Sequence, residues 1–416
     1  MKILFIHQNF PGQYKHLAPL LAREGHDCVA LTLRVDKPVN WQGVRVRPYT
    51  LPERKAQNTH PWLLDLDTKV TRAEACYHAA IRLREAGFTP DLILAHPGWG
   101  ESLFLRDVWP GARLALYCEL YHQPTEDFTR FDPEFIKTDM ALETLRLRMK
   151  NLNNTLHFPL AEAGISPTRF QADTFPAEFR DKITVSHDGI DTQTARPRPA
   201  VRVTINDRIT LTRKDEVITF VNRNLEPYRG YHVFMRALPD LLRARPNATV
   251  VIVGGDGVSY GARPPGGKSW KQIFIDEIRG QISDADWQRV RFVGRIPYEQ
   301  FIYLLQLSRV HVYMSYPFVL SWSLMEAMSC GAAIVASDTA PVREVITHDK
   351  TGRLVDFFDG AALIGEIDAL MGDEAARARL GTAARAHIKA GYDLETICLP
   401  RQVQWVSEVM DLPLAL

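Results

Sequence analysis

The sequence predicts an α/β protein of two domains, each with a parallel β-sheet covered by helices on both faces. The chain has 416 residues, which is too long for one ordinary hydrophobic core. Short apolar runs alternate with helical patterns almost throughout, as in parallel sheets. A proline-rich stretch within Asp191–Val203 separates two such series, because Thr-Ala-Arg-Pro-Arg-Pro-Ala forbids regular structure. We therefore expect one domain over residues 1–195 and another over residues 205–395.

The first half opens with a strand, a loop, a helix and a second strand. Leu17, Leu20 and Leu21 recur at helical spacing, and Gly25 provides a C-terminal stop for that helix. The apolar runs of this half predict the strands Lys2–His7, Cys28–Leu33, Asp91–His96, Leu114–Glu119 and Ile183–Ser186.

The second half repeats the pattern after the linker. Its first helix buries Phe234 and Leu238, with Pro239 as an unusual interior residue. The tail is predicted to form a helix over about residues 396–416 that packs back on the first domain. Ligands of such folds bind beyond the carboxyl ends of the strands, so we expect the active site in a cleft between the domains. The predicted strands are Val217–Arg223, Thr249–Gly254, Val290–Gly294, Val310–Ser315 and Ala332–Ser337.

Composition excludes several classes of protein. The formal net charge is +1, so no overall field favours nucleic acid or an anionic membrane. The five cysteines lack Cys-x-x-Cys spacing, which favours a reducing compartment and no structural zinc. No signal-peptide pattern follows Met1, and no run approaches the roughly 18 apolar residues of a spanning helix. We expect a cytoplasmic protein, and a position at the inner face of the membrane stays open.

Two arginines follow the first strand of the second half. Arg223 lies at the strand's carboxyl end, and Arg229 lies at the start of the next helix, where Gly230 allows close backbone approach. Two guanidinium groups beside a helix N-terminus form an anion site suited to a diphosphate. The alternative interpretation is two solvated surface arginines.

In these residues the sequence resembles family 4 of the retaining glycosyltransferases (glycosyl transferases group 1), which share the GT-B fold. The resemblance covers most of the chain. The family has a strand ending in Gly-Arg-Leu and then a Lys-Gly pair that opens a helix. Asn222–Leu225 and the pair Arg229-Gly230 match this pattern, with Asn in place of Gly and Arg in place of Lys. The resemblance implies that Arg223 and Arg229 hold the diphosphate of a nucleotide sugar. Arginine keeps the charge of lysine and changes its geometry.

Glu326 lies in an apolar helical context, where an unpaired carboxylate is costly. Taken alone, it is more readily explained as a glutamate on a helix surface. The resemblance covers Glu326-Ala-Met, the following glycine and a Val-Ala-Ser strand, and it implies that Glu326 binds both ribose hydroxyls of the nucleotide. A carboxylate has the acceptor geometry for a vicinal diol.

One position departs from the family, whose motif has a second glutamate eight residues earlier that contacts the donor sugar. Phe318 stands there, and phenylalanine accepts no hydrogen bond. Three explanations stay open: the sugar lacks a hydroxyl at that place, loop amides replace the contact, or activity is reduced. The expected donor-binding loop comprises Val319, Leu320, Ser321 and Trp322.

Two further loops of the second half match the family's nucleotide-proximal turns. Gly254-Gly255-Asp256-Gly257 follows one strand and Gly294-Arg295 follows another, so Gly255 and Arg295 are donor-binding candidates. The extension Val258–Trp270 is too long for a plain connection and is a candidate lid.

In the first half, polar residues follow several predicted strands. Gly12 lies after the first strand, and the resemblance places it near the donor phosphates. A single glycine is not the dinucleotide-binding pattern. The resemblance also places His96 close to the reacting sugar. Glu101, Glu119 and His122 are acceptor or sugar candidates, against the alternative that such groups only bond one another.

Two other features give weaker evidence of function. Asp65-Leu66-Asp67 mimics a metal-binding motif but opens a helical segment, where acidic residues are ordinary dipole partners, so we reject a metal role. Asp127–His157 carries Arg146, Arg148 and Lys150 among leucines. It is a candidate for peripheral membrane contact, although the alternation of charged and apolar residues predicts a solvated helix without a clean apolar face.

The resemblance implies a glycosyltransferase that moves a sugar from a UDP-, GDP- or ADP-sugar to a glycan, lipid or small-molecule acceptor, with retention. No cofactor, essential metal or nucleic acid is expected. His96, Arg223, Arg229 and Glu326 are the expected catalytic set. The alternatives are a non-catalytic nucleotide- or glycan-binding protein, which Phe318 favours, and a nucleotide-sugar epimerase using Glu101 and Glu119.

Overall fold

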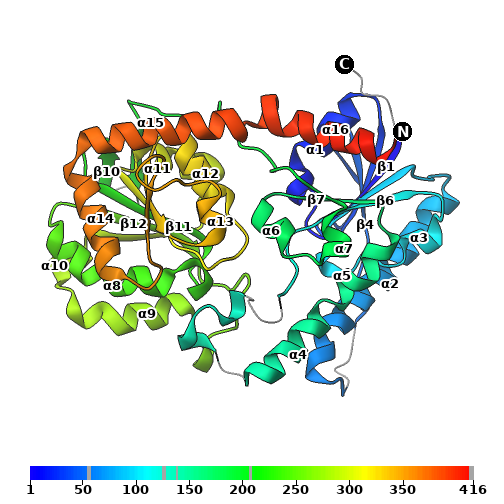
Figure 1. Ribbon diagram of the computed structural model, residues 1–416, viewed down its shortest axis with the longest axis horizontal. Helices are drawn as coiled ribbons and strands as arrows, with labels where there is room; N and C mark the ends of the chain where they lie inside the picture. Colours follow the sequence, from blue (N-terminus) through cyan, green and yellow to red (C-terminus); the bar gives the residue numbers. More distant parts are fainter. Residues whose placement is uncertain (54–57, 124–127, 137–138, 206–208, 412–416) are drawn as a thin grey trace. The chain divides into compact units, whose positions relative to one another are not determined.

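The computed structural model describes residues 1–53, 58–123, 128–136, 139–205 and 209–411 (Figure 1). The chain divides into two compact units. The first comprises Met1–Arg130, Phe135–Asp188 and Glu395–Leu416, and the second comprises Phe131–Glu134 and Gly189–Leu394. The short segment Phe131–Glu134 thus belongs with the second unit, although the chain on both sides of it belongs to the first.

The first unit contains an eight-stranded sheet in the order β3-β4-β2-β1-β5-β6-β7-β8. All neighbouring strands are parallel except β3 and β4. The five predicted strands are present as β1, β2, β5, β6 and β8, and β3, β4 and β7 were not predicted. The bounds are β1 Lys2–Ile6, β2 Asp27–Thr32, β3 Val39–Trp41, β4 Val44–Pro48, β5 Leu92–Ala95, β6 Arg113–Tyr117, β7 Ala163–Ser166 and β8 Ile183–Val185.

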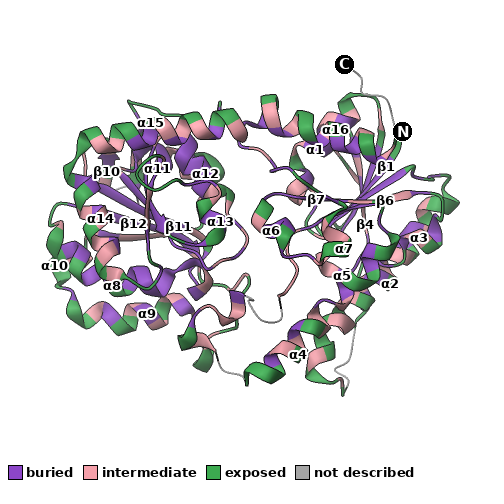
Figure 2. Ribbon diagram, in the orientation of Figure 1, coloured by how far each residue is buried: buried purple, intermediate pink, exposed green. Residues whose placement is uncertain are grey.

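Helices cover both faces of this sheet, because successive strand residues point to opposite sides. Ile3 and Phe5 pack with α1 and α16, whereas Leu4 and Ile6 pack with α2 and α3. Figure 2 shows the strands buried between these helices. The bounds are α1 Leu17–Arg23, α2 Leu64–Glu85, α3 Leu105–Val108, α4 Met140–Lys150, α5 Leu152–His157, α6 Arg169–Asp173, α7 Ala177–Arg180 and α16 Leu399–Val409.

The C-terminal segment packs within the first unit. Trp405, Val406 and Val409 of α16 join the core cluster beneath α1. Arg113, at the start of β6, donates to the carbonyl of Val409 and to the carboxylate of Asp411. The last part of the predicted tail helix, residues 412–416, lies outside the described residues.

The second unit contains a six-stranded parallel sheet in the order β13-β12-β11-β14-β15-β16. All five predicted strands of this half are present, as β11 to β15. A separate hairpin, β9 with β10, was not predicted. The bounds are β9 Arg202–Ile205, β10 Ile209–Thr212, β11 Val217–Asn224, β12 Thr249–Gly255, β13 Val290–Gly294, β14 Val310–Tyr313, β15 Ala333–Ser337 and β16 Arg353–Val355.

Helices of the second unit also form two layers. On one face α11, α12 and α15 share a core with β14 and β15. On the other, Phe234 of α8 stacks on Phe220 of β11, with ring centroids 4.5 Å apart. Pro239 lies inside α8, as the sequence indicated. The bounds are α8 Tyr231–Ala244, α9 Trp270–Ile278, α10 Asp284–Trp287, α11 Tyr298–Leu307, α12 Trp322–Ser329, α13 Ala340–Arg343, α14 Gly360–Gly372 and α15 Glu374–Gly391.

Among the described residues, no helix has the length and apolar character needed to cross a membrane.

Candidate functional site

Arg229 is a buried cation at the carboxyl edge of the second unit's sheet. The residue is only 8% exposed. Nη1 donates to the hydroxyls of Tyr313 (3.3 Å) and Ser315 (3.1 Å) and to the carbonyl of Val319 (2.9 Å). Arg229 forms no ion pair within the described part of the chain. A buried charge held only by neutral acceptors is costly unless an anion joins it, so this edge is a candidate anion site.

The backbone around Gly230 sets this arrangement. Gly230 adopts a left-handed conformation, with φ of +65°. A Cβ added there would meet Cβ of Met314 at 2.2 Å, so only glycine lets the start of α8 approach the end of β14 this closely. The sequence predicted a close backbone approach at Gly230 but not its partner, and the contact with Met314 brings Arg229 beside the residues that follow β14.

A second basic group lies at the ends of β11, β12 and β13. Arg295 donates from Nη2 to Oδ1 of Asn224 at 2.8 Å. A Cβ on Gly255 would lie 2.6 Å from Nε of Arg295, so the glycine makes room for the guanidinium group. Arg223, near the end of β11, is exposed. The structure therefore brings Gly255 and Arg295 together through Asn224, which the sequence analysis did not single out as a site residue.

Glu326 lies in the middle of α12 and is 9% exposed. The hydroxyl of Tyr298, the first residue of α11, donates to its Oε1 at 2.7 Å. Burial and the nearby Glu326 carboxylate raise the pKa of Tyr298, so the hydroxyl keeps its proton and donates. The donor that a buried carboxylate requires is thus supplied from a different helix.

Phe318 stands where the resembled family has its first glutamate. Its side chain is 2% exposed and packs on the ring of Tyr260, with centroids 4.6 Å apart. The guanidinium carbon of Arg229 lies 5.1 Å from the centroid of Phe318 and 5.7 Å from that of Tyr260. Such contacts stabilise a cation through the negative faces of the rings. Phe318 therefore packs against the cation of the site.

The remaining residues of the predicted donor loop have separate roles. The amide of Ser321 donates to the hydroxyl of Tyr313 at 3.0 Å, and its own hydroxyl caps the start of α12. Leu320 is buried in the core cluster of α11 and α12. Trp322 is 39% exposed. Tyr313 thus connects Arg229 to the start of the helix that carries Glu326.

The long extension after β12 is anchored to this edge. Glu226, 1% exposed, accepts hydrogen bonds from the backbone N–H groups of Ser259 (3.2 Å), Tyr260 (3.4 Å) and Gly261 (3.3 Å). Asn224 also donates to the hydroxyl of Ser259 at 2.7 Å. These bonds hold the candidate lid so that Tyr260 lies over Arg229 and Phe318.

In the first unit, His7 and His96 lie at the carboxyl ends of the neighbouring strands β1 and β5. Nδ1 of His7 accepts from the amide of Asn9 (3.0 Å), and its Nε2 bonds Oε1 of Gln13 (2.7 Å). Burial, and then the nearby His96, lower the pKa of His7 to about 3, so the ring is neutral near pH 7.

His96 is held by stacking on both of its faces. Its ring stacks on Trp99 (4.3 Å between centroids) and on Tyr117 (5.5 Å). Nδ1 accepts from the amide of Gly98 at 3.1 Å, so a ring proton lies on Nε2. Nε2 is buried without a hydrogen bond in the described chain, and Oε2 of Glu119 is 3.6 Å away. A positioned donor next to a partly exposed carboxylate suits contact with a hydroxylated ligand.

The other residues predicted in the first half lie as follows. Gly12 has φ of +48°, and an added Cβ would meet Nε2 of His7 at 2.3 Å, so Gly12 packs directly on this group. Glu101 is 1% exposed and accepts from the hydroxyl of Tyr49 at 2.7 Å. Burial raises its pKa. The backbone N–H of His122 donates to Oδ1 of Asn151, and Nδ2 of Asn151 donates to the backbone carbonyl of His122.

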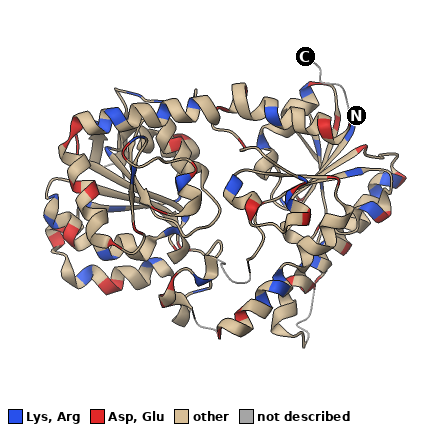
Figure 3. Ribbon diagram, in the orientation of Figure 1, with Lys and Arg blue, Asp and Glu red and all other residues tan. Residues whose placement is uncertain are grey.

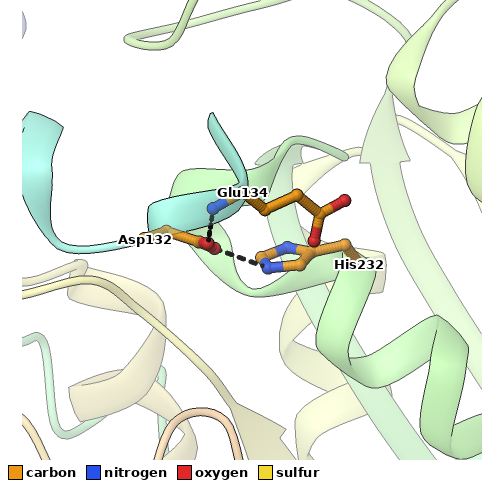
Figure 4. Close-up of side chains that lie close together, drawn as sticks. All are labelled: Asp132, Glu134 and His232. Carbon is orange, nitrogen blue, oxygen red and sulfur yellow. Dashed lines mark hydrogen bonds and ion pairs between the residues drawn. The ribbon is translucent and has the colours of Figure 1, made fainter. Parts of the chain in front are cut away.

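Asp132, Glu134 and His232 of the second unit have ligand atoms within 4.8 Å of one another (Figure 4). Nε2 of His232 donates to Asp132 at 2.9 Å, and the hydroxyl of Tyr316 donates to the same oxygen at 2.7 Å. Although burial raises it, these bonds hold the pKa of Asp132 below its usual value. Arg236 donates two hydrogen bonds to Glu134, at 2.6 and 2.8 Å. The group is a compensated network that ties Phe131–Glu134 to α8.

The predicted metal-motif mimic lies in the first turn of α2, where Asp65 pairs with Lys69 at 2.8 Å. Figure 3 shows charges of both signs distributed over the two units.

The structure thus joins most of the predicted residues into one group in each unit. The group of the second unit, which we name the cation edge, contains Gly255, Arg229, Arg295, Val319 and Ser321. The group of the first unit, which we name the imidazole edge, contains Gly12, His96 and Glu119. Glu101 and His122 have the contacts described above. The sequence analysis assigned no site role to Tyr298, Tyr260, Glu226, Asn224 or His7. His7 and Asn224 lie at strand ends and Tyr260 lies in the candidate lid, so these three carried a usable signal.

Comparison with known proteins gives matches to both units. The family description "Glycosyl transferase family 4 group" matches residues 24–195, and "Glycosyl transferases group 1" matches residues 203–387. A D-inositol 3-phosphate glycosyltransferase of Streptomyces avermitilis is 27% identical over 56% of this chain and 49% of its own. The chain therefore matches about half the length of this relative.

Solved structures are similar over nearly the whole chain. Sucrose-phosphate synthase from Thermosynechococcus elongatus has a TM-score of 0.75 and 18% identity, with 98% of this chain and 99% of that one covered. The Anabaena protein HepE in complex with UDP-glucose has a TM-score of 0.67 and 17% identity, with 98% and 100% covered. At these identities the likeness shows the fold, which is GT-B.

Proposed function

Because the chain belongs to family 4 of the glycosyltransferases, we propose that it moves a hexosyl or related sugar from a nucleoside diphosphate sugar to an acceptor. One observation carries the proposal: Arg229 is a buried guanidinium group with only neutral acceptors around it, at the carboxyl edge of the sheet. The anion that such a group requires is the diphosphate of the donor. Arg223 and Arg295 add positive charge near the same edge.

The mechanism uses this charge to stabilise the leaving group. As the bond between the anomeric carbon and the diphosphate breaks, negative charge grows on the diphosphate oxygens. Arg229 is already fixed by three hydrogen bonds, so it stabilises that charge without reorganising. We propose that the arginines perform this role without a metal, and that the anomeric configuration is retained as in the resembled family. An unchanged rate in excess EDTA supports the first point, and NMR of the product anomer tests the second.

The imidazole edge of the first unit is proposed to contact the sugar. His96 offers a buried N–H that has no hydrogen-bond acceptor in the described chain, and a sugar hydroxyl would accept from it. Glu119, 3.6 Å from His96, is proposed to orient the imidazole or to bind a further hydroxyl. Gly12 is proposed to allow close approach beside His7.

Phe318 makes the sugar-facing wall less polar than the family pattern. Its ring packs on Arg229 and Tyr260 and offers no acceptor. We propose that the donor sugar is held there by backbone groups of Val319–Trp322 or lacks the hydroxyl that the family's glutamate binds. Comparing a hexose donor with its deoxy analogues tests this choice.

The test of function is an incubation of the full chain with UDP-, GDP- and ADP-sugars, beginning with UDP-glucose, which HepE binds. Release of nucleoside diphosphate that depends on an added acceptor supports transfer. An altered sugar still attached to its nucleotide would indicate an epimerase, and binding without turnover would indicate a non-catalytic protein.

We further propose a peripheral membrane contact through α4. Leu142 and Leu145 are 48% and 42% exposed, and Met149 continues their stripe at helical spacing. The buried face of the helix carries Leu147 instead. The sequence expectation of a solvated helix stays a prediction, and lipid binding through this stripe is the alternative that the vesicle experiment tests. Figures 2 and 3 show that α4 is largely exposed and carries several basic residues.

Arg148 and Lys150 suit a bilayer with anionic lipid, whereas Arg146 pairs with Glu143 on the same helix. Co-sedimentation with vesicles containing phosphatidylglycerol tests this contact. Replacing both Leu142 and Leu145 by Ser should abolish binding, and replacing the exposed Val185 by Ser should not. If these leucines contact a second copy of the chain and not lipid, the protein should be a dimer in solution.

A further inference from the structure

Tyr298 and Glu326 form a hydrogen bond between two helices of the second unit. Tyr298 is the first residue of α11, and Glu326 lies in the second turn of α12. The tyrosine hydroxyl lies 2.7 Å from Oε1 of the glutamate. The tyrosine is 47% exposed and the glutamate 9% exposed, so the bond lies at the rim where a buried carboxylate meets solvent.

The two helices that present these side chains are rigidly packed. Ile302 and Leu305 of α11 share one core cluster with Leu324 and Met325 of α12, and all four are at most 2% exposed. Pro297 precedes Tyr298 and has φ of −57°, so the start of α11 is conformationally restricted. The distance between the hydroxyl and the carboxylate is therefore set by the core.

The direction of the hydrogen bond is also fixed. An ionised carboxylate only accepts hydrogen bonds, so the tyrosine must donate. Burial, together with the carboxylates of Glu326 and Asp191, raises the pKa of Tyr298. The hydroxyl consequently stays protonated throughout the neutral range, and the bond is present whenever Glu326 is ionised.

We propose that Tyr298 is a positioning residue that orients the carboxylate of Glu326 toward the two ribose hydroxyls of the donor nucleotide. The proposal rests on the proposed function and on the ribose-binding role that the family resemblance implies for Glu326. The terminal torsion of a glutamate is broad and has no single preferred value. One fixed hydrogen bond removes this freedom, and it leaves acceptor directions for a diol because a carboxylate has about four. The site thereby distinguishes ribonucleotides from deoxyribonucleotides.

The test is a comparison of two ligands in two forms of the full chain. Isothermal titration first identifies which of UDP, GDP and ADP binds the wild type most tightly. The 2′,3′-dideoxy analogue of that nucleotide is then measured against the wild type and Tyr298→Phe. We expect Tyr298→Phe to weaken binding of the ribonucleotide about tenfold and to change binding of the dideoxy analogue less than twofold, because only the ribonucleotide uses the carboxylate.

Two further variants separate positioning from a structural effect. In a Glu326→Ala background, Tyr298→Phe should have no further effect on either ligand, because its partner is gone. Tyr303→Phe is the matched control, since Tyr303 lies on the same helix and donates to Glu299 instead. Binding in this control should equal that of the wild type for both ligands. With donor sugar, Tyr298→Phe should raise KM and leave kcat nearly unchanged.

Equal weakening of both ligands by Tyr298→Phe would overturn the proposal, because it would indicate a displaced helix and not a misoriented carboxylate. The proposal would also be overturned if Tyr298→Phe preferred the ribonucleotide over the dideoxy analogue as strongly as the wild type does. That result would leave the proposed function intact. A wild type that binds no nucleoside diphosphate, or that binds the ribo and dideoxy forms equally, would refute the ribose site itself and the role of Tyr298 with it.

Discussion

The cation edge and the imidazole edge both lie at the carboxyl ends of buried parallel strands, but they hold their polar groups by different means. Arg229 is fixed by three hydrogen bonds to neutral oxygens. His96 is fixed mainly by ring stacking on Trp99 and Tyr117, with one bond from a backbone amide. Hydrogen bonds from a guanidinium group fix the position of its positive charge. Stacking fixes a ring in place and leaves its outer nitrogen available.

This difference matches the two parts of a group-transfer reaction. A leaving diphosphate needs a permanent charge that does not titrate, which arginine provides. A sugar hydroxyl needs a directed donor, which a stacked imidazole provides. The comparison therefore predicts that damage to the two edges will have different kinetic signatures.

The largest effect is expected at the cation edge. Arg229→Ala should lower kcat on the order of 1000-fold, because the charge that develops on the diphosphate loses its fixed partner. Arg229→Lys keeps the charge but loses the planar guanidinium geometry that places Nη1 among its three acceptor oxygens, and it should retain measurable turnover. Steady-state kinetics with the identified donor checks both, and circular dichroism confirms that the fold is intact.

Arg243→Ala is the control for that variant, because Arg243 is an exposed arginine on α8 that pairs with Asp240. It should behave as the wild type. Turnover in Arg229→Ala equal to that of the control would refute the diphosphate assignment.

The second prediction concerns acid. Burial lowers the pKa of His7 to about 3 and those of His157 and His187 to about 4 in the first unit, whereas His311 falls to about 3 in the second. Each folded pKa lies below the unfolded value of about 6.5. The contribution of each histidine to the free energy of unfolding is therefore fully present above pH 6.5. It decreases as the pH drops toward the folded pKa, and the loss is about 2 kcal/mol per histidine at pH 5.

Because three of these four histidines lie in the first unit, acidification from pH 7 to pH 5 should destabilise that unit more. Hydrogen exchange measured by mass spectrometry at the two pH values, corrected for the intrinsic rate, reports each unit separately. Faster opening of the second unit at pH 5 would contradict the assignment of these rings as neutral and buried.

The same contrast explains what could be predicted from the sequence. Arg229 and Gly230 are adjacent in the chain and belong to one strand–turn–helix segment, so their local spacing carried the prediction. Tyr298 lies 28 residues before Glu326 and reaches it only because α11 packs on α12. Glu226 likewise acts on residues 33 to 35 positions later. No pattern of residue spacing predicts such contacts between distant parts of the chain, since they depend on tertiary packing.

Strands were missed for a related reason. β4, with the sequence Val-Arg-Val-Arg-Pro, and β3, with Val-Asn-Trp, lie at the edge of the first sheet. Arginine and asparagine alternate there with apolar residues, because an edge strand is partly exposed. The apolar runs that marked the central strands are therefore absent from these two. β7, with Ala-Gly-Ile-Ser, is too short and too small in side-chain volume for a clear apolar signal.

A third prediction separates the two edges kinetically. His96→Asn should lower kcat about 30-fold, the size expected when one directed hydrogen bond to the reacting sugar is lost. Affinity for the nucleoside diphosphate should stay within twofold, because the side chains proposed to bind it belong to the second unit, and Gly12 of the first unit offers no side chain. Turnover and calorimetric binding are measured on the same preparation.

His78→Asn serves as the control, since His78 is an exposed histidine on α2 of the same unit. If His96→Asn weakens nucleotide binding as much as it slows turnover, the division of roles between the two edges is wrong.

The smallest effect is expected where a glycine packs against the imidazole edge. Gly12→Ala places a Cβ within 2.3 Å of Nε2 of His7 and also forces alanine to a φ of +48°. The ring can turn aside, at the cost of its bond to Gln13, so the expected loss is about 1 to 2 kcal/mol of unfolding free energy.

Gly87 has φ of +84° with no atom within 4 Å of an added Cβ, so Gly87→Ala suffers the backbone strain alone. The difference between the two variants in urea denaturation measures the contact with His7. Equal losses would show that His7 is loosely held and that stacking alone maintains the imidazole edge.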